Sequence, residues 1–187
     1  MVYAASRGPG AIPATARSAQ TLGGMNDVTA KSPAECSATE LEDFVSLVLA
    51  GGEVSPQGLA DRAANAASLS FLRRNGCLVG VAGLKRPEAS YRTRIASSAK
   101  FALSHEALPL ELGWVFLMPS ARGSKLSLPL CAPLVQAAGA AGIFATSRSS
   151  NAGMHATLRK LGFLRVGEEW LSKQVKENLC LFVRAAA

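Results

Sequence analysis

The amino-acid sequence predicts an α/β fold with a mixed, mostly antiparallel central sheet flanked by helices. Two observations carry this prediction. Apolar runs on both sides of Asn75-Gly76 predict a β-hairpin, because this dipeptide readily forms the tight turn between paired strands. Apolar runs at 110–118 and 142–147 predict buried strands, and each is followed by a turn and a helical pattern. With 187 residues, the chain is long enough for one domain with its own core.

The N-terminal part divides into a tail and the first structured elements. Residues 1–24 are rich in Ala, Gly, Ser, Pro and Thr without periodicity, so we expect a disordered tail and a single domain over 25–187. Met25, at this boundary, is a candidate for the true start of the protein. Residues 28–30 predict a short first strand. Ser37-Ala-Thr-Glu40 then has the pattern of a capping box, which begins a helix.

The middle of the chain contains the hairpin and an insertion. Ser55-Pro56 predicts the start of a second helix, since proline is favoured in the first helical turn. The hairpin strands follow at 68–74 and 77–84. Residues 87–108 then form an insertion in which we expect a short helix at 95–103. We expect this insertion to shape a substrate site, and the alternative is a plain surface excursion.

The C-terminal part alternates strands and helices. Arg122-Gly123 forms a tight turn that opens a helix, in which Pro133 would cost about 3 kcal/mol and so predicts a late start or a kink. Asn151 begins another helix, which ends with a basic turn at Gly162-Phe163. Residues 163–170 and 179–184 predict two further strands.

Composition argues against several classes of protein. There are 20 basic and 13 acidic residues, for a net charge of +7, but the basic clusters are only pairs, which disfavours a nucleic-acid binder. No apolar run reaches the ~18 residues of a membrane span. The four scattered cysteines form no C-x-x-C pair, and there are two histidines. We therefore expect reduced thiols, a cytoplasmic location and no metal site.

The order of elements over 111–163 resembles the acyl-CoA half of the GNAT N-acetyltransferase superfamily. That order is strand, Arg-Gly turn, helix, strand, Asn-led helix and Gly-Phe, and the hairpin ahead of it extends the resemblance to roughly residues 26–184. The resemblance implies an acyl-CoA-dependent N-acyltransferase, which transfers acetyl from acetyl-CoA to a primary amine by direct attack. Acetyl-CoA would be the acyl-donor substrate. The alternative is a degenerate GNAT-fold module that binds CoA without efficient catalysis, and a basic nucleic-acid binder is a third interpretation.

The resemblance places the acyl-CoA site on two segments and one asparagine. The pantetheine arm would follow the strand edge at Phe116, Leu117 and Met118. The pyrophosphate would bind at a helix N-terminus, on Arg122, Gly123, Ser124, Lys125, Leu126 and Ser127. Arg122 matches the family motif, which resembles Arg/Gln-x-x-Gly-x-Gly/Ala, whereas Lys125 replaces a Gly and Ser127 a Gly or Ala. Asn151 matches the family Asn, although by itself it fits a simple helix cap.

Direct attack on a thioester requires an unprotonated amine, a stabilised oxyanion and a proton for the thiolate. A strand N–H near Leu117 would stabilise the oxyanion. Glu111 is the first candidate for the general base and His105 the second. The alternative for Glu111 is a strand-end charge that faces solvent or pairs with Arg. The family acid is a Tyr seven residues after the Asn, where this chain has Leu158. Tyr91 is the remaining candidate acid, and water is the other source of this proton.

Two arginines of the insertion point to the acceptor. Arg92 and Arg94 would favour an amine that also carries a carboxylate or phosphate, and the alternative is that both are solvated surface charges. The sequence does not identify the amine, and it leaves a homodimer open.

Overall fold

The computed structural model describes residues 25–172 and 176–186, and seven of their segments form one sheet in the order β1-β2-β3-β4-β5-β7-β6. Among these strands β4 and β5 are parallel, and the other neighbours are antiparallel. The predicted mixed, mostly antiparallel sheet is therefore confirmed. The predicted tail over 1–24 lies outside the described residues. The strands are β1 Asn26–Lys31, β2 Ser68–Arg74, β3 Cys77–Lys85, β4 Leu110–Leu117, β5 Ile143–Arg148, β6 Leu164–Leu171 and β7 Asn178–Arg184.

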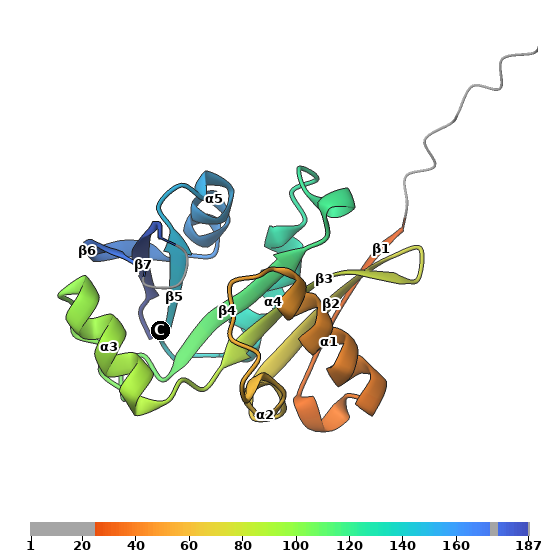
Figure 1. The fold of residues 1–187 in the computed structure, drawn as a ribbon, viewed down its shortest axis with the longest axis horizontal. Helices are drawn as coiled ribbons and strands as arrows, with labels where there is room; N and C mark the ends of the chain where they lie inside the picture. Colours follow the sequence, from red (N-terminus) through yellow and green to blue (C-terminus); the bar gives the residue numbers. More distant parts are fainter. Residues whose placement is uncertain (1–24, 173–175, 187) are drawn as a thin grey trace, which may run out of the picture.

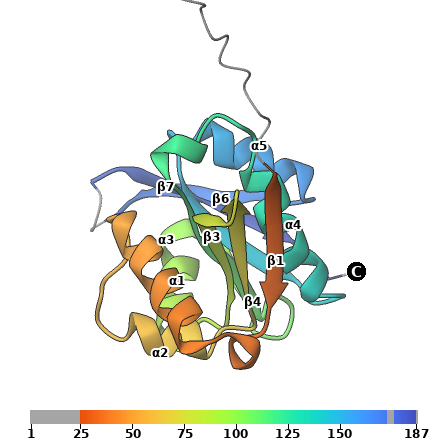
Figure 2. The ribbon, with the colours of Figure 1, turned by 90° about the vertical axis from the view of Figure 1, so that its right-hand side faces the viewer.

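Helices cover both faces of the sheet (Figures 1 and 2). On one face, α4 packs across β1–β4, and α5 lies beside it. On the other face, α1 and α2 cover the first half of the sheet and α3 covers the β6–β7 end. The helices are α1 Ala38–Ala50, α2 Leu59–Ala64, α3 Ala89–Ala99, α4 Ser127–Ala137 and α5 Ala152–Lys160. None of the described helices is long and apolar enough to cross a bilayer.

Each group of helices packs against the sheet through its own hydrophobic cluster, which gives three clusters among the described residues. The largest joins α4 and α5 to the sheet through side chains such as Leu112, Leu130 and Leu158. A second places Phe44 of α1 against Phe71 of β2, with ring centroids 5.8 Å apart. The third packs α3 against β5 and β7. Because α1–α2 and α3 have separate clusters on the same face, the sheet surface between them remains uncovered.

The local signals at the first helix act as predicted. Ser37 caps α1 by accepting a hydrogen bond from the Glu40 N–H at 3.2 Å, and the Glu40 carboxylate accepts one from the Ser37 N–H at 2.9 Å. The expected helix start at Ser55-Pro56 is wrong, since α2 begins at Leu59. Gly58 has a φ of 62°, so the chain turns once more before the helix forms.

The hairpin is confirmed, and the helix of the insertion is longer and earlier than predicted. Asn75 and Gly76 have φ values of 52° and 81°, as the tight turn between β2 and β3 requires. The predicted helix at 95–103 is in fact α3, Ala89–Ala99. It ends because Lys100 adopts a left-handed φ of 48°. The polar residues at its start conceal the helical period, since Arg92 takes a buried position on its inner face.

The helix after the Arg-Gly turn includes its interior proline. Pro133 lies inside α4, which nevertheless begins at Ser127 directly after the turn. Of the two predicted alternatives, the late start is therefore wrong, and a kink at Pro133 stays a prediction. The last two predicted strands are confirmed as β6 and β7, which pair in antiparallel fashion.

Candidate active site

A cleft opens where β4 and β5 part. The two strands pair only at Leu110 with Ile143 and at Glu111 with Phe144, and beyond these residues β4 and β5 no longer pair. The Met118 N–H donates to Val79 O at 2.9 Å, on the β3 side. Since successive N–H groups alternate sides along a strand, the Leu117 N–H faces the opening. Figure 1 shows the two strands diverging from this junction.

A β-bulge in β4 turns side chains into this cleft. Val81 lies opposite Phe116 and Gly83 opposite Gly113, so β4 contains one more residue than β3 over this interval. Trp114 takes up the irregularity with a φ of 52°, a left-handed conformation that costs about 1–2 kcal/mol. Its indole packs directly over Gly83, where an added Cβ would lie 2.6 Å from the ring. The bulge therefore places Trp114 and Phe116 on the cleft wall.

The cleft has a volume of about 1530 Å³ and is bounded by both halves of the sheet face. The loop between α1 and α2 forms one wall and α3 another, with β3, β4 and β5 as the floor. An ion pair joins the two sides, because Arg148 at the end of β5 lies 2.9 Å from Glu53 of the α1–α2 loop. This position and size suit an extended ligand that enters between β4 and β5.

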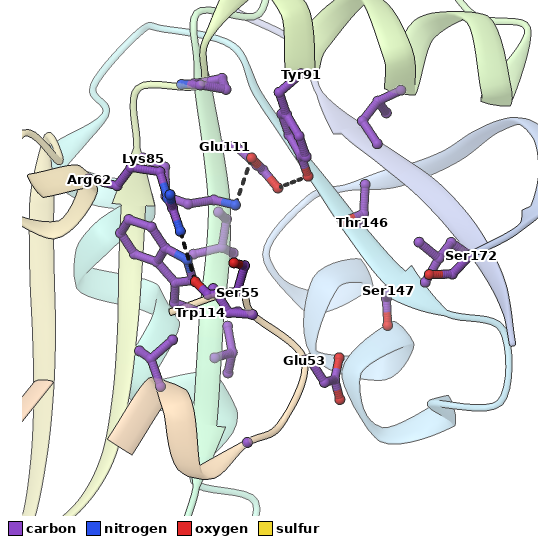
Figure 3. A pocket seen from close by; sticks show the side chains of 18 of the residues that line it. Glu53, Ser55, Arg62, Lys85, Tyr91, Glu111, Trp114, Thr146, Ser147 and Ser172 are labelled. Carbon is purple, nitrogen blue, oxygen red and sulfur yellow. Dashed lines mark hydrogen bonds and ion pairs between the residues drawn. The ribbon is translucent and has the colours of Figure 1, made fainter. Parts of the chain in front are cut away.

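Glu111 is the buried charge at the deep end of the cleft. Its side chain is 2% exposed, and it accepts a hydrogen bond from the Tyr91 hydroxyl at 3.0 Å. The other carboxylate oxygen lies 2.7 Å from Lys85 Nζ. Figure 3 shows the three side chains meeting from α3, β3 and β4. Glu111 is therefore a buried charge whose partner is a lysine, rather than an arginine or solvent.

Aromatic rings surround the ammonium group of Lys85. Its Nζ lies 5.5 Å from the Tyr91 ring centroid and 5.3 Å from that of Trp114. The side chain crosses from β3 over Gly113, where an added Cβ would meet Nζ at 2.9 Å. Ring faces attract cations, so the two rings and the carboxylate together stabilise a positive charge at this point.

The Tyr91 hydroxyl is a firmly protonated donor. Burial raises the pKa of Tyr91 well above its ordinary value of 10, and the neighbouring Glu111 carboxylate raises it further. The phenol therefore keeps its proton at neutral pH and directs it at Glu111.

Of the predicted pyrophosphate loop, residues 122–127, Arg122 lines the cleft and the others lie outside its lining. Gly123 and Lys125 have left-handed φ values of 75° and 58°, so Lys125 adopts the conformation for which the family motif has glycine. The N-terminus of α4 receives no side-chain cap, which leaves its first N–H groups available. Arg122 lines the cleft, and its guanidinium carbon lies 5.7 Å from the centroid of the Phe116 ring. Its Nε donates a hydrogen bond to Leu117 O at 3.0 Å.

The structure brings some of the other predicted cofactor residues to the cleft. Phe116, Leu117 and Asn151 line it, whereas Met118 is 38% exposed and lies beyond its lining. The Asn151 side chain caps α5 by accepting from the Met154 N–H at 3.0 Å. Ser127 bonds to Thr157 at 2.8 Å and so joins α4 to α5.

The predicted arginine pair is divided by the structure. Arg92 is 6% exposed and donates to the carbonyl oxygens of Leu108 and Pro109, at 2.5 and 3.1 Å. Its guanidinium thus holds the end of the insertion, so the alternative of a solvated surface charge is wrong for Arg92, and its predicted substrate role stays a prediction. Arg94 is exposed, lines the cleft and lies 5.2 Å from the Tyr91 ring centroid. Its predicted substrate role stays a prediction.

Two further residues considered for the chemistry, His105 and Leu158, lie outside the lining of the cleft. His105 is exposed and lines a separate small hollow beside Arg92, so the structure does not bring this second candidate base to Glu111. Leu158, at the position of the family acid, is fully buried in the core.

Lys85 and Trp114 were missed in the sequence. Gly113 inside an apolar strand is a signal for a bulge and could have indicated Trp114. Lys85 needed the register of β3 against β4, which pairs it directly with Glu111.

Comparison with known proteins gives matches of fold. No family model and no curated protein matches this sequence. An acyl-CoA N-acyltransferase from Pseudomonas aeruginosa is 20% identical and superposes with a TM-score of 0.59, over 86% of this chain and all (100%) of that one. A GNAT family acetyltransferase from Streptococcus agalactiae is 13% identical with a TM-score of 0.60, over 86% and 96% of the two chains.

A third solved structure contains the expected acyl donor. It is yncA from Salmonella typhimurium with its cofactor acetyl-CoA, 16% identical, with a TM-score of 0.55 over 86% of this chain and 93% of that one. The seven-stranded sheet and its flanking helices match these enzymes along nearly the whole described chain. The protein therefore has the fold of the GNAT acetyltransferases.

Proposed function

We propose that this protein is an acyl-CoA-dependent N-acyltransferase that transfers acetyl from acetyl-CoA to a primary amine. The observation that carries the proposal is the cleft between β4 and β5, with a buried carboxylate at its deep end and Arg122 in its lining, five residues before the uncapped N-terminus of α4. The first feature suits an amine, and the second suits a pyrophosphate. The acetyl-CoA complex among the similar folds agrees with this choice of donor.

Different residues in and beside the cleft would bind different parts of acyl-CoA. Arg122 and the N–H groups at the start of α4 would hold the pyrophosphate. The backbone of Leu117, which faces the opening, would bind the pantetheine arm by strand-like hydrogen bonds, and the Phe116 ring would pack against the arm. Asn151 stands on the opposite side of the gap. The arm would then point along β4 toward Glu111.

The chemical step is a direct attack on the thioester. The amine nitrogen bonds to the carbonyl carbon, the carbon–sulfur bond breaks, and a backbone N–H of β4 that faces the opening stabilises the oxyanion. Glu111 accepts the proton of the amine. We assign Tyr91 the orientation of this carboxylate, because its own proton is directed at Glu111, and we assign protonation of the thiolate to water.

A degenerate CoA-binding module is the second candidate, and two observations favour it. Lys85 occupies one oxygen of Glu111, so the base is already paired. Leu158 leaves no phenol where the family acid stands.

Titration calorimetry with acetyl-CoA tests the binding site. Arg122→Glu should weaken binding at least ~10-fold, since it reverses the charge beside the pyrophosphate. Arg159→Glu is the matched control, because Arg159 is exposed on the last turn of α5 and does not line the cleft. Equal affinities for wild type and Arg122→Glu would refute the placement.

A thiol-release assay separates the two candidate functions. Free CoA should appear from acetyl-CoA when primary amines are added. Tight binding of acetyl-CoA without release of thiol to any amine in a broad screen would favour the CoA-binding module.

A further inference from the structure

Lys85 has the surroundings of an acyl acceptor. It lies inside the cleft, its side chain is 17% exposed, and its Nζ is 2.7 Å from Glu111, the proposed general base. An amine beside a base in an acyl-CoA cleft is the arrangement that the proposed reaction requires of its substrate. Here the amine belongs to the enzyme.

The position of Lys85 along the cleft agrees with the expected path of the acyl group. Arg122 marks the mouth of the cleft, and Glu111 marks the deep end, where β4 and β5 still pair. A donor arm that begins at Arg122 and follows β4 would carry its thioester toward Glu111. Lys85 reaches that end by crossing Gly113, beside the bulge at Trp114.

Other described lysines with a carboxylate partner lack this context. Lys31 pairs with Glu40 and Lys100 with Glu168, at 2.8 and 2.9 Å, but neither lines the cleft. The Lys100 pair is well exposed, with side chains 69% and 61% accessible. All three lysines therefore lie close to a glutamate, but among them only Lys85 lines the cleft.

We propose that Lys85 is acylated by the acyl-CoA bound to its own chain, which makes it a self-modification site. This inference rests on the proposed function, because it requires a thioester in the cleft. The modified side chain would be a neutral amide between Tyr91 and Trp114. Its ion pair with Glu111 would be lost, and the acyl group would occupy the acceptor end of the cleft, so the modification limits turnover.

The step balances with the groups in the cleft. Lys85 Nζ gives one proton to Glu111, whose other oxygen is held by the Tyr91 hydroxyl. The neutral amine attacks the thioester carbon, a carbon–nitrogen bond forms, and the carbon–sulfur bond breaks. The second proton leaves the nitrogen for the thiolate. Ammonium, carboxylate and acyl-CoA thus become amide, carboxylic acid and free CoA, with no other reactant.

Peptide mapping by mass spectrometry, after incubation of the whole protein with acetyl-CoA and no added amine, tests this proposal. We expect one acetyl group per chain, on Lys85. Its rate should saturate with acetyl-CoA and be independent of protein concentration, because the reaction occurs within one complex. Glu111→Gln should slow it ~10²-fold or more, since the proton acceptor is removed. Lys85→Arg should abolish it, and Lys100→Arg is the matched control that should leave it unchanged.

The same samples are assayed for acetyl-CoA affinity, for thiol release with added amines and, by circular dichroism, for folding. Acylation of amines with Lys85 unmodified overturns the proposal and leaves the proposed function standing. Labelling of Lys85 and Lys100 at similar rates, or undiminished labelling of Lys85 in folded Glu111→Gln, shows ordinary chemical acylation and also overturns it. Absence of acetyl-CoA binding overturns both.

Discussion

Arg92 and Arg94 lie two residues apart on α3, and the structure predicts opposite consequences for their replacement. Arg92→Met keeps most of the aliphatic volume over the Phe144 ring but removes the donors to Leu108 O and Pro109 O. An unsatisfied buried polar group costs about 1–3 kcal/mol. Leu108 is buried and Pro109 is only half-buried. Leaving both carbonyl oxygens without a donor should therefore lower the free energy of unfolding by roughly 2–4 kcal/mol.

This loss is a large fraction of the total stability of a domain, about 5–15 kcal/mol. For a chain of this size it corresponds to a fall in Tm of roughly 5–15 °C. Arg94→Met should change stability by less than about 0.5 kcal/mol, because Arg94 is exposed. Urea unfolding followed by circular dichroism measures both variants, with an unchanged m-value as the check that the same transition is compared.

The reasoning fails if Arg92→Met is as stable as the wild type, or if Arg94→Met is the more destabilised of the two. A folded Arg92→Met whose sole defect is a raised KM for an anionic amine would instead support the predicted substrate role of Arg92.

Three further predictions concern base, backbone and pH. Glu111→Gln should lower turnover ~10²-fold or more with acetyl-CoA affinity near wild type, and an unaltered pH–rate profile in steady-state assays would count against Glu111 as the base. Lys125→Gly should raise the free energy of unfolding by about 1 kcal/mol, because it relieves the left-handed backbone, and equal or lower stability in urea would contradict this. Hydrogen bonds from Lys31 and the Ser37 N–H lower the pKa of Glu40 from 4.5 to about 2. The stability it contributes is therefore present above pH 4.5 and lost as pH falls toward 2. Glu40→Gln should flatten the stability profile in that window, and an unchanged acid transition in thermal melts would argue otherwise.

Much of the fold could be predicted because its signals are local. The turn at Asn75-Gly76 and the cap at Ser37 each depend on a few neighbouring residues, and the structure has both as expected. The predicted start of α2 was wrong because Gly58 adopts a left-handed conformation two residues after the proline, and the helix begins only after it. The predicted start of α3 was wrong because a buried arginine, Arg92, interrupts the apolar pattern of the helix.

The site was only partly predictable, because its geometry comes from register and packing. The apolar run around Glu111 indicated its burial. Its partners depend on the pairing of β3 with β4 and on the docking of α3, which no local pattern specifies. For the same reason the sequence does not distinguish Arg92 from Arg94, although the first is buried and the second is exposed in the structure.

The short junction between β4 and β5 has a consequence for how cooperatively the molecule holds together. The hydrogen-bond ladder between the two halves of the sheet consists of two residue pairs, and the other connections are the hydrophobic cluster shared by both halves and the Glu53–Arg148 ion pair. The parts of β4 and β5 that lie beyond these two pairs lack a ladder on the side of the cleft, so their amides should exchange with solvent sooner than those of the paired strands. An acyl-CoA arm laid between the strands would replace the missing ladder and connect both halves. Its binding should then slow amide exchange as far away as β6, and the substrate would act as a structural part of the sheet.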